Sequence, residues 1–161
     1  RKLAQNGDFE AVLIADNGDM AIKAAPYIRK NASETAKILG TDLWNTSSNL
    51  AGAPSIRGAW FASVSDSLYK QYADKYRARY GTAPFRLSSL GYDSVLLTVK
   101  VARDWKVGSP FPINKLTDKG GFIGLDGVFR FKADGVSERA LEVQEIRSGS
   151  FVVVDPAPKG F

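Results

Sequence analysis

Acidic and amide side chains follow two short apolar runs of this sequence. Asp16, Asn17 and Asp19 follow the run at residues 9–15, and Asp42 follows a second run after only a Gly-Thr pair. A carboxylate in a partly closed crevice can bind an ammonium group, gaining about 1.5–3 kcal/mol per charge-assisted hydrogen bond. Asp and Asn also cap helices and shape turns, so a purely structural role for these residues stays open beside ligand binding.

The elements around these residues form a strand, a helix and a second strand. Residues 9–15 and 36–39 have the length and apolar character of buried strands, and residues 20–30 carry apolar side chains at helical spacing. A βαβ unit places the ends of both strands at the carboxyl edge of a parallel sheet. Small ligands bind in crevices at such edges. Pro26 is expected to kink the helix or to confine its regular part to one side.

The rest of the chain predicts an α/β fold, with a mainly parallel sheet flanked by helices and an antiparallel β tail. The further predicted elements are a strand over residues 56–63, a helix over 67–80 that Gly81 ends, a helix over 87–105 that is apolar on more than one side, and antiparallel strands from residue 128 onward. The polar stretch 40–55 is long for a bare connection, so we expect it to be functional or partly helical.

Composition restricts the chemistry that this chain can perform. Its 161 residues contain no cysteine and no histidine, which excludes disulfides, thiolate catalysis, Cys/His zinc sites and the commonest general base. The formal net charge of +5 is consistent with a solvated surface of mixed charge. No apolar run reaches the roughly 20 residues of a membrane helix. We therefore predict no enzyme activity and no cofactor.

Other chemical interpretations of the same residues are weaker. A two-carboxylate hydrolase would need a second catalytic group and a fixed carboxylate separation, and neither is indicated. Asp16, Asp19 and Asp42 could hold Mg²⁺ or Ca²⁺, but their spacing matches no known cation loop, so we predict no metal. The glycine-rich segment 120–127 precedes a strand, whereas a phosphate-binding loop opens a helix.

A stripe of tyrosines on the predicted helix 67–80, with basic residues beside it, is the one candidate for a nucleic-acid surface. Stacking aromatics with cations are typical of such surfaces. The tyrosines, however, share the face of the helix that we expect to be buried in the core. We therefore predict no nucleic-acid partner. The residues concerned are Tyr69, Tyr72, Tyr76 and Tyr80, with Lys70, Lys75, Arg77 and Arg79.

Taken in order, several segments resemble the second half of a type I periplasmic binding protein of the leucine/isoleucine/valine-binding kind. The resemblance covers almost the whole chain. The segments are AVLIADNG at 11–18, ILGTD at 38–42, IRGAWF at 56–61, YRARYGTAP at 76–84, LGYDSV at 90–95, and the closing glycine-rich segment with FRF at 129–131 and DG at 134–135.

The resemblance implies two α/β lobes, joined by three crossovers, that close on a small solute without performing chemistry. It implies that Asp42 holds the ammonium group of an amino-acid ligand and that Asn17, beside Asp16, lies near a ligand-facing position that is often aromatic. Residues 63–66 resemble a crossover, with Ser63, Ser65 and Asp66 as hinge residues. Residues 1–62 would belong to one lobe, 63–112 to a helical segment returning to the other, and 113–161 to a β-rich tail returning to the first.

Two functions follow from the resemblance. The first is capture of an amino acid or similar ligand for an ABC importer, with the transporter permease as partner. The second function comes from a subgroup with the same fold, whose members are lipid-anchored factors that activate penicillin-binding proteins. The segment RGAWFAS at 57–63 and the tyrosine-rich helix resemble this subgroup. In that case the partner would be a peptidoglycan synthase. Both imply a periplasmic location.

The resemblance also implies that this chain is about half of a longer protein. Residues 1–5, followed by Asn6-Gly7, have the character of a helix end, which agrees with that expectation. The helices 67–80 and 87–105 would then lack the sheet on which they pack in the family. We predict that the isolated chain covers their apolar faces either against a second copy of itself or against a preceding segment that is cleaved but still bound.

Overall fold

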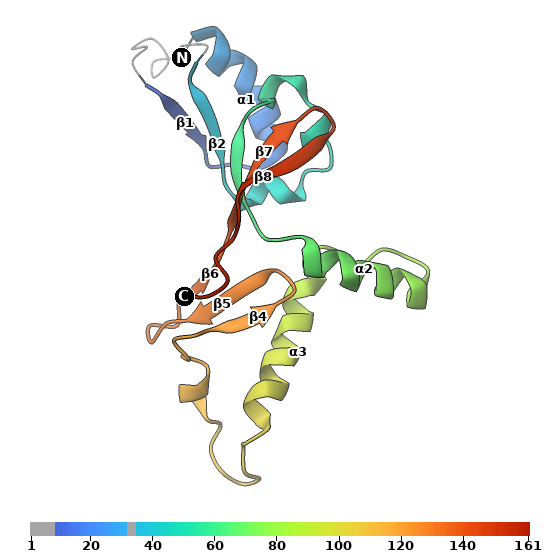
Figure 1. Cartoon of the computed structure of the whole chain (residues 1–161), viewed down its shortest axis with the longest axis vertical. Helices are drawn as coiled ribbons and strands as arrows, with labels where there is room; N and C mark the ends of the chain where they lie inside the picture. The colour runs from blue at the N-terminus through green and yellow to red at the C-terminus, as the bar shows by residue number, and fades with distance from the viewer. Residues whose placement is uncertain (1–8, 32–34) are drawn as a thin grey trace. The chain divides into compact units, whose positions relative to one another are not determined.

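The computed structural model describes residues 9–31 and 35–161 and divides into two compact units, whose elements are labelled in Figure 1. The first unit holds the described residues up to Ser63 together with Glu142–Pro156, and the second holds Val64–Leu141 with Ala157–Phe161. The chain therefore passes between the units after Ser63, after Leu141 and after Pro156. The helix end expected at residues 1–5 lies outside the described residues.

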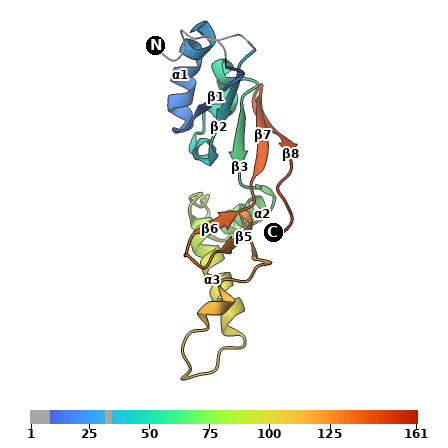
Figure 2. The ribbon, with the colours of Figure 1, turned by 90° about the vertical axis from the view of Figure 1, so that its left-hand side faces the viewer.

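The first unit is built on a five-stranded sheet with the order β1-β2-β3-β7-β8. Its strands are β1 (Ala11–Ile14), β2 (Lys37–Gly40), β3 (Trp60–Ser63), β7 (Glu142–Arg147) and β8 (Ser150–Asp155). The pairs β1–β2 and β2–β3 are parallel, and the pairs β3–β7 and β7–β8 are antiparallel. Figure 2 shows β3, β7 and β8 side by side. The predicted parallel sheet and the predicted antiparallel tail are both confirmed.

The third strand begins later than the sequence predicts. The 3₁₀ helix η4 (Pro54–Ile56) occupies the start of the predicted strand, and Gly58 then turns the chain with a φ of 80°. Pro54 fixes its own φ and lacks the N–H that a ladder would need, which favours a turn over a strand at this point. The prediction of a strand from residue 56 is therefore wrong by four residues.

Helix α1 (Gly18–Asn31) packs on this sheet through small side chains. Ala21 and Ala25 are fully buried, which lets the helix backbone approach the sheet closely. The helix continues without interruption across Pro26. The core beneath it contains the buried aliphatic and aromatic residues Ile38, Trp44, Leu50, Ile56, Phe61 and Ile146.

The polar stretch between β2 and β3 is partly helical, as predicted. It contains the 3₁₀ helices η2 (Asp42–Thr46), η3 (Leu50–Gly52) and η4. Each of these short helices inserts one fully buried apolar side chain into the core, respectively Trp44, Leu50 and Ile56. The polar residues of the stretch therefore surround a set of apolar anchors that fix the connection onto the sheet.

The second unit combines two helices with a three-stranded antiparallel sheet. Its elements are α2 (Ser67–Tyr80), α3 (Ser88–Ala102), the 3₁₀ helix η5 (Ile113–Lys115), β4 (Phe122–Gly124), β5 (Gly127–Phe131) and β6 (Ser137–Arg139). Helix α2 has the predicted bounds and ends at Gly81, whose φ of 75° is the left-handed conformation that glycine adopts easily.

Helix α3 is far more exposed than its sequence suggests. Of its residues only Ser89, Asp93 and Val101 are buried. Val95 and Val99 are 63% and 52% exposed. The helix is therefore apolar on more than one side, but the described chain does not bury more than one of those sides.

Candidate functional site

The ends of three parallel strands bring the predicted site residues to one edge of the first unit. Ile14 of β1 is in register with Gly40 of β2, and Gly40 is in register with Phe61 of β3. The residues that follow these strands therefore gather at the carboxyl edge of the sheet. This edge carries Asp16, Asn17, Thr41, Asp42 and Ser63.

Asn17 has a structural role at this edge. Its Oδ1 atom accepts a hydrogen bond of 3.0 Å from the backbone N–H of Met20, which lies in the first turn of α1. This is the geometry of a helix N-cap, in which a side-chain oxygen satisfies one of the free N–H groups of the first turn. The carboxylate of Asp16 in turn accepts a hydrogen bond of 2.7 Å from the backbone N–H of Asn17. Both side chains remain exposed.

Asp42 differs from its neighbours because its carboxylate is free. It is the first residue of η2, whose N-cap residue is Thr41, and no side-chain hydrogen bond caps that helix. Asp42 is exposed and forms no ion pair or hydrogen bond with any residue of the ranges 9–31 and 35–161. Its charge is therefore available at the sheet edge, which is the property that binding of an ammonium group requires.

Buried polar atoms behind Asp42 complete this edge, and among their residues only Ser63 was predicted to be functional, as part of a hinge. Ser63 is fully buried, and its Oγ lies 3.1 Å from Oδ1 of Asn45 in η2. Oγ1 of Thr41 and Nε1 of Trp44 are buried without a hydrogen-bond partner in the described part of the chain. The signal that could have found them is the length of the polar stretch 40–55, because its helical turns place Asn45 against the end of β3.

The predicted hinge residues lie where the chain leaves the first unit. Ser63 ends β3, and Ser65 and Asp66 precede α2. Oγ of Ser65 is 3.3 Å from Oγ of Ser67, and the carboxylate of Asp66 is 3.6 Å from Nη2 of Arg86 within the second unit. Their hinge role stays a prediction.

The alternative of a metal site at Asp16, Asp19 and Asp42 is not supported. Among residues 9–31 and 35–161, no three acidic side chains are placed so that they could hold a metal ion. The described helices also include none that is long and apolar enough to cross a membrane.

The tyrosines of α2 form a ladder that is half-buried at Tyr69, Tyr72 and Tyr76 and exposed at Tyr80, so the predicted burial of this face in the core is wrong. No residue of α2 is buried. The ring centroids of successive tyrosines are 5.9, 6.0 and 4.6 Å apart from Tyr69 through Tyr72 and Tyr76 to Tyr80. The rings pack against one another at tilted angles of 46–55° and are only partly covered, because the described elements of this unit do not close over them.

A groove of about 430 Å³ runs along this tyrosine ladder. Its walls include Tyr76, Tyr80 and Tyr92, and its charged residues are the basic Lys75 and Arg79. The acidic residue of α2, Asp74, is 3.9 Å from Arg77 and does not line the groove. The groove therefore combines aromatic surface with positive charge.

A buried polar network beside the tyrosine ladder holds the second unit together, and its Arg86 lies 3.9 Å from the ring centroid of Tyr69. Asp126 is buried and accepts hydrogen bonds from Arg86 at 2.5 Å and from Ser89 at 2.6 Å. Asp93 is 4% exposed, and its carboxylate accepts a hydrogen bond of 2.7 Å from the backbone N–H of Leu125. Burial raises the pKa of the Asp93 carboxyl above its ordinary value, although the Leu125 N–H acts in the opposite direction. These contacts fix the turn between β4 and β5 against α3.

Comparison with solved structures identifies the fold. Leucine-binding protein LivK of Thermotoga maritima matches 92% of this chain with a TM-score of 0.60 and 21% identity. LivJ of Streptococcus pneumoniae, a branched-chain amino acid transporter substrate-binding protein in complex with isoleucine, matches 96% with a TM-score of 0.58 and 24% identity. The LpoA C-domain of Haemophilus influenzae, a regulator of PBP1A, matches 90% with a TM-score of 0.61 and 18% identity.

These similarities define the class of fold: the chain has the α/β fold of type I periplasmic binding proteins, shared by amino-acid-binding proteins and by LpoA. The suspected resemblance is thus confirmed at the level of the fold. The chain spans 44% of LivK, 47% of LivJ and 44% of the LpoA C-domain, somewhat less than half of each. No protein-family model matches the sequence, and the comparison with curated proteins found no match.

Proposed function

We propose that this chain is part of a non-catalytic extracytoplasmic binding protein that captures an amino acid or a similar small ligand with an ammonium group. The observation that carries the proposal is the carboxylate of Asp42, which has no partner among residues 9–31 and 35–161, at the carboxyl edge of the parallel sheet. The names of LivK and LivJ, which bind leucine and isoleucine, support the same class of ligand. Delivery to an ABC importer in the bacterial periplasm follows from this proposal.

The edge is suited to a cationic group and not to an anion. Its exposed charges, Asp16 and Asp42, are both negative, and Asn17 uses its oxygen to cap α1. A ligand ammonium could pair with Asp42 without displacing an existing partner, so the gain would not be offset by a broken contact. The carboxylate of an amino-acid ligand would need donors from outside this edge.

Calorimetric titration with pools of amino acids tests this proposal. If a pool binds to the chain, its binding free energy should be weaker by about 2–5 kcal/mol in Asp42→Asn, because the substitution leaves the ligand ammonium without a charged partner. Asp155→Asn is a matched control, because Asp155 is an exposed carboxylate at the end of β8. Binding that is unchanged in Asp42→Asn, or that falls equally in the control, would contradict the proposal.

A second function is favoured by the tyrosine groove on α2. In this alternative the chain belongs to a periplasmic regulator that activates a peptidoglycan synthase through protein contacts. An aromatic, positively charged groove that the described chain leaves open is typical of a protein-interaction surface. The similarity to the LpoA C-domain, whose name describes a regulator of PBP1A, supports this alternative.

Thermal melting separates the two functions. A ligand at 100 times its dissociation constant should stabilise the chain by about 2.7 kcal/mol. A shift with one amino-acid pool would favour solute capture. No shift with any pool, together with binding to a penicillin-binding protein that Tyr76→Ala and Tyr80→Ala weaken, would favour the regulator.

A further inference from the structure

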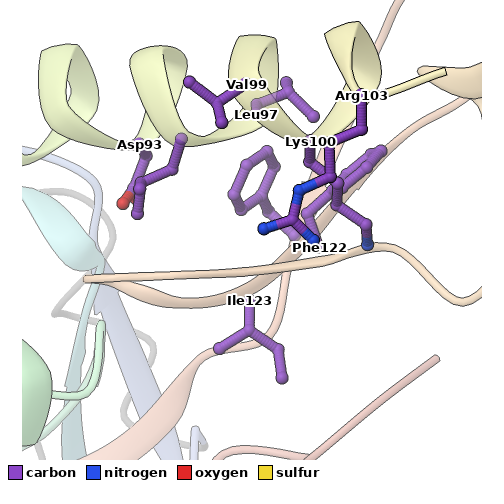
Figure 3. Close-up of a pocket in the computed structure, with 9 residues that line it drawn as sticks. Asp93, Leu97, Val99, Lys100, Arg103, Phe122 and Ile123 are labelled. Atoms are coloured by element: carbon purple, nitrogen blue, oxygen red, sulfur yellow. The ribbon is translucent and has the colours of Figure 1, made fainter.

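A second groove of the second unit, separate from the tyrosine groove, lies between α3 and the β4–β5 hairpin. Its volume is about 340 Å³, which is within the range of small-molecule sites. Leu96, Leu97, Phe122, Ile123 and Phe129 supply its apolar walls. Figure 3 shows α3 along one side of the groove, with Phe122 facing it from the hairpin and the side chain of Ile123 pointing away from α3 at the groove's edge.

The two ends of this groove carry opposite charges. Figure 3 shows Lys100 and Arg103 together at one end and Asp93 at the other. Lys100 lies seven positions after Asp93 on the helix, which corresponds to a distance of about 10 Å along the axis. An elongated ligand that lies along α3 would therefore meet positive charge at one end and negative charge at the other.

The cations at the positive end, Lys100 and Arg103, form no direct ion pair within the described ranges, and Arg103 interacts electrostatically with the adjacent Asp104. The ammonium of Lys100 lies 4.7 Å from the ring centroid of Phe122, so the ring holds the charge at the groove wall. The two side chains are three residues apart on one helix and can reach the same group.

The negative end is a fixed, buried carboxylate. One oxygen of Asp93 accepts the hydrogen bond from Leu125, and the other, Oδ2, is buried without a partner in the described chain. A side chain at Gly124 would collide with Oδ2, so the carboxylate lies directly against the backbone of the hairpin. A second anion at this end would meet negative charge that cannot move away.

We propose that this groove binds an amphipathic monocarboxylate, with its head group on Lys100 and Arg103 and its apolar body along Leu97, Phe122 and Phe129 toward Asp93. The site lies wholly within the second unit and does not depend on ligand capture by the first unit. The charge at its far end makes a specific demand on the ligand. A dicarboxylate of the same length should bind poorly, because its second carboxylate would lie beside Asp93.

Calorimetric titration with decanoate and with sebacate, the dicarboxylate of equal carbon number, tests this site. Decanoate should bind at least about tenfold more tightly than sebacate to the unmodified chain. The double variant Lys100→Gln/Arg103→Gln should weaken decanoate binding at least about fivefold. Lys70→Gln/Arg77→Gln is the matched control, because it removes the same charge from exposed positions of α2 that line neither groove and should leave the affinity unchanged.

Asp93→Asn provides the second arm of the test. Asparagine keeps the oxygen that accepts from Leu125 and removes the negative charge, so sebacate should recover to within about threefold of decanoate. Circular dichroism establishes that each variant is folded. Equal affinity of the two acids for the unmodified chain, or an equal loss in the α2 control, would overturn the proposal. If Asp93→Asn does not fold, the proposal is decided by the affinities of the two acids for the unmodified chain and for the Lys100→Gln/Arg103→Gln variant.

Discussion

The hydroxyl of Ser55 donates a hydrogen bond of 3.1 Å to the backbone carbonyl of Ile22, in the middle of α1. In a regular helix this carbonyl would accept from the N–H four residues later, but that residue is Pro26 and has no N–H. The connection between β2 and β3 therefore supplies the donor that proline removes. This explains how α1 continues through a residue that usually breaks or kinks a helix.

Removal of that hydroxyl should destabilise the chain only while proline is present. Ser55→Ala leaves the Ile22 carbonyl without its donor and should cost about 1 kcal/mol of unfolding free energy. In the Pro26→Ala background the new N–H can serve the carbonyl, so the same change should cost markedly less. Urea unfolding of the four proteins of this cycle measures the difference. Equal costs in both backgrounds would show that the two residues are not coupled.

Truncation of Asn17 and of Asp42 should have different effects although the residues share an edge. Asn17→Ala removes the cap of α1 and should lower the unfolding free energy by about 1 kcal/mol. Asp42→Ala removes a side chain with no partner in the described chain and should change it by less than about 0.5 kcal/mol. Chemical denaturation of the two variants at one pH is sufficient. A large loss in Asp42→Ala would contradict the absence of a structural partner for this carboxylate in the described chain.

The stability of the chain should depend on pH through Asp93. Because burial raises its pKa, the folded state holds the proton to a higher pH than the unfolded state does. The contribution of this carboxyl to the free energy of unfolding is therefore largest below the ordinary aspartate pKa. It decreases as the pH rises through the raised pKa of the folded state, and it is constant above that pKa. Asp93→Asn should remove that decrease, so the variant should gain stability relative to the parent as the pH rises from about 4.

Unfolding curves of the parent and of Asp93→Asn at a series of pH values test this. Other carboxyls have lowered pKa values, among them Glu145, which accepts from Trp60 and Arg147, but they are the same in both proteins and cancel in the difference. A difference in stability that does not vary with pH would contradict the prediction.

The exposed apolar faces of α2 and α3 should make this chain associate when it is alone in solution. Leu90 is 47% exposed, Val95 is 63% exposed and Tyr80 is 59% exposed. Large apolar side chains that stay in water forgo roughly 1.5–3 kcal/mol of burial each. Sedimentation of the 161-residue chain should therefore show a dimer or a larger species. A compact monomer that binds no apolar dye would show that these faces are covered within the chain.

The elements of this fold could be predicted well where local pattern decides them. The βαβ order and the bounds of α2 follow from apolar runs, helical spacing and the glycine that ends the helix. Burial could not be predicted in the same way. The tyrosine stripe indicates which face of α2 is apolar, but which elements cover that face depends on tertiary contacts that periodicity does not encode.

The candidate site was predictable in part for the same reason. Strand ends place Asp16, Asn17 and Asp42 at one edge, and this follows from topology alone. The distinction between Asn17 as a cap and Asp42 as a free carboxylate depends on which N–H groups each side chain reaches. The contact of Ser63 with Asn45 joins residues 18 apart and requires the folded 3₁₀ turn, which spacing could not reveal.

The pairing of β3 with β7 also determines the order in which the chain can fold during synthesis. β3 ends at Ser63 and its partner β7 begins at Glu142, so the whole second unit except its last residues is translated between them. Until β7 emerges, Phe61 lacks its neighbour Ile146 in the core and β3 has an unpaired edge. The closing of so long a loop makes this step slow. The first unit therefore reaches its native state after the second unit has been synthesised, and a nascent chain stalled before residue 142 would present β3 as an open template for aggregation.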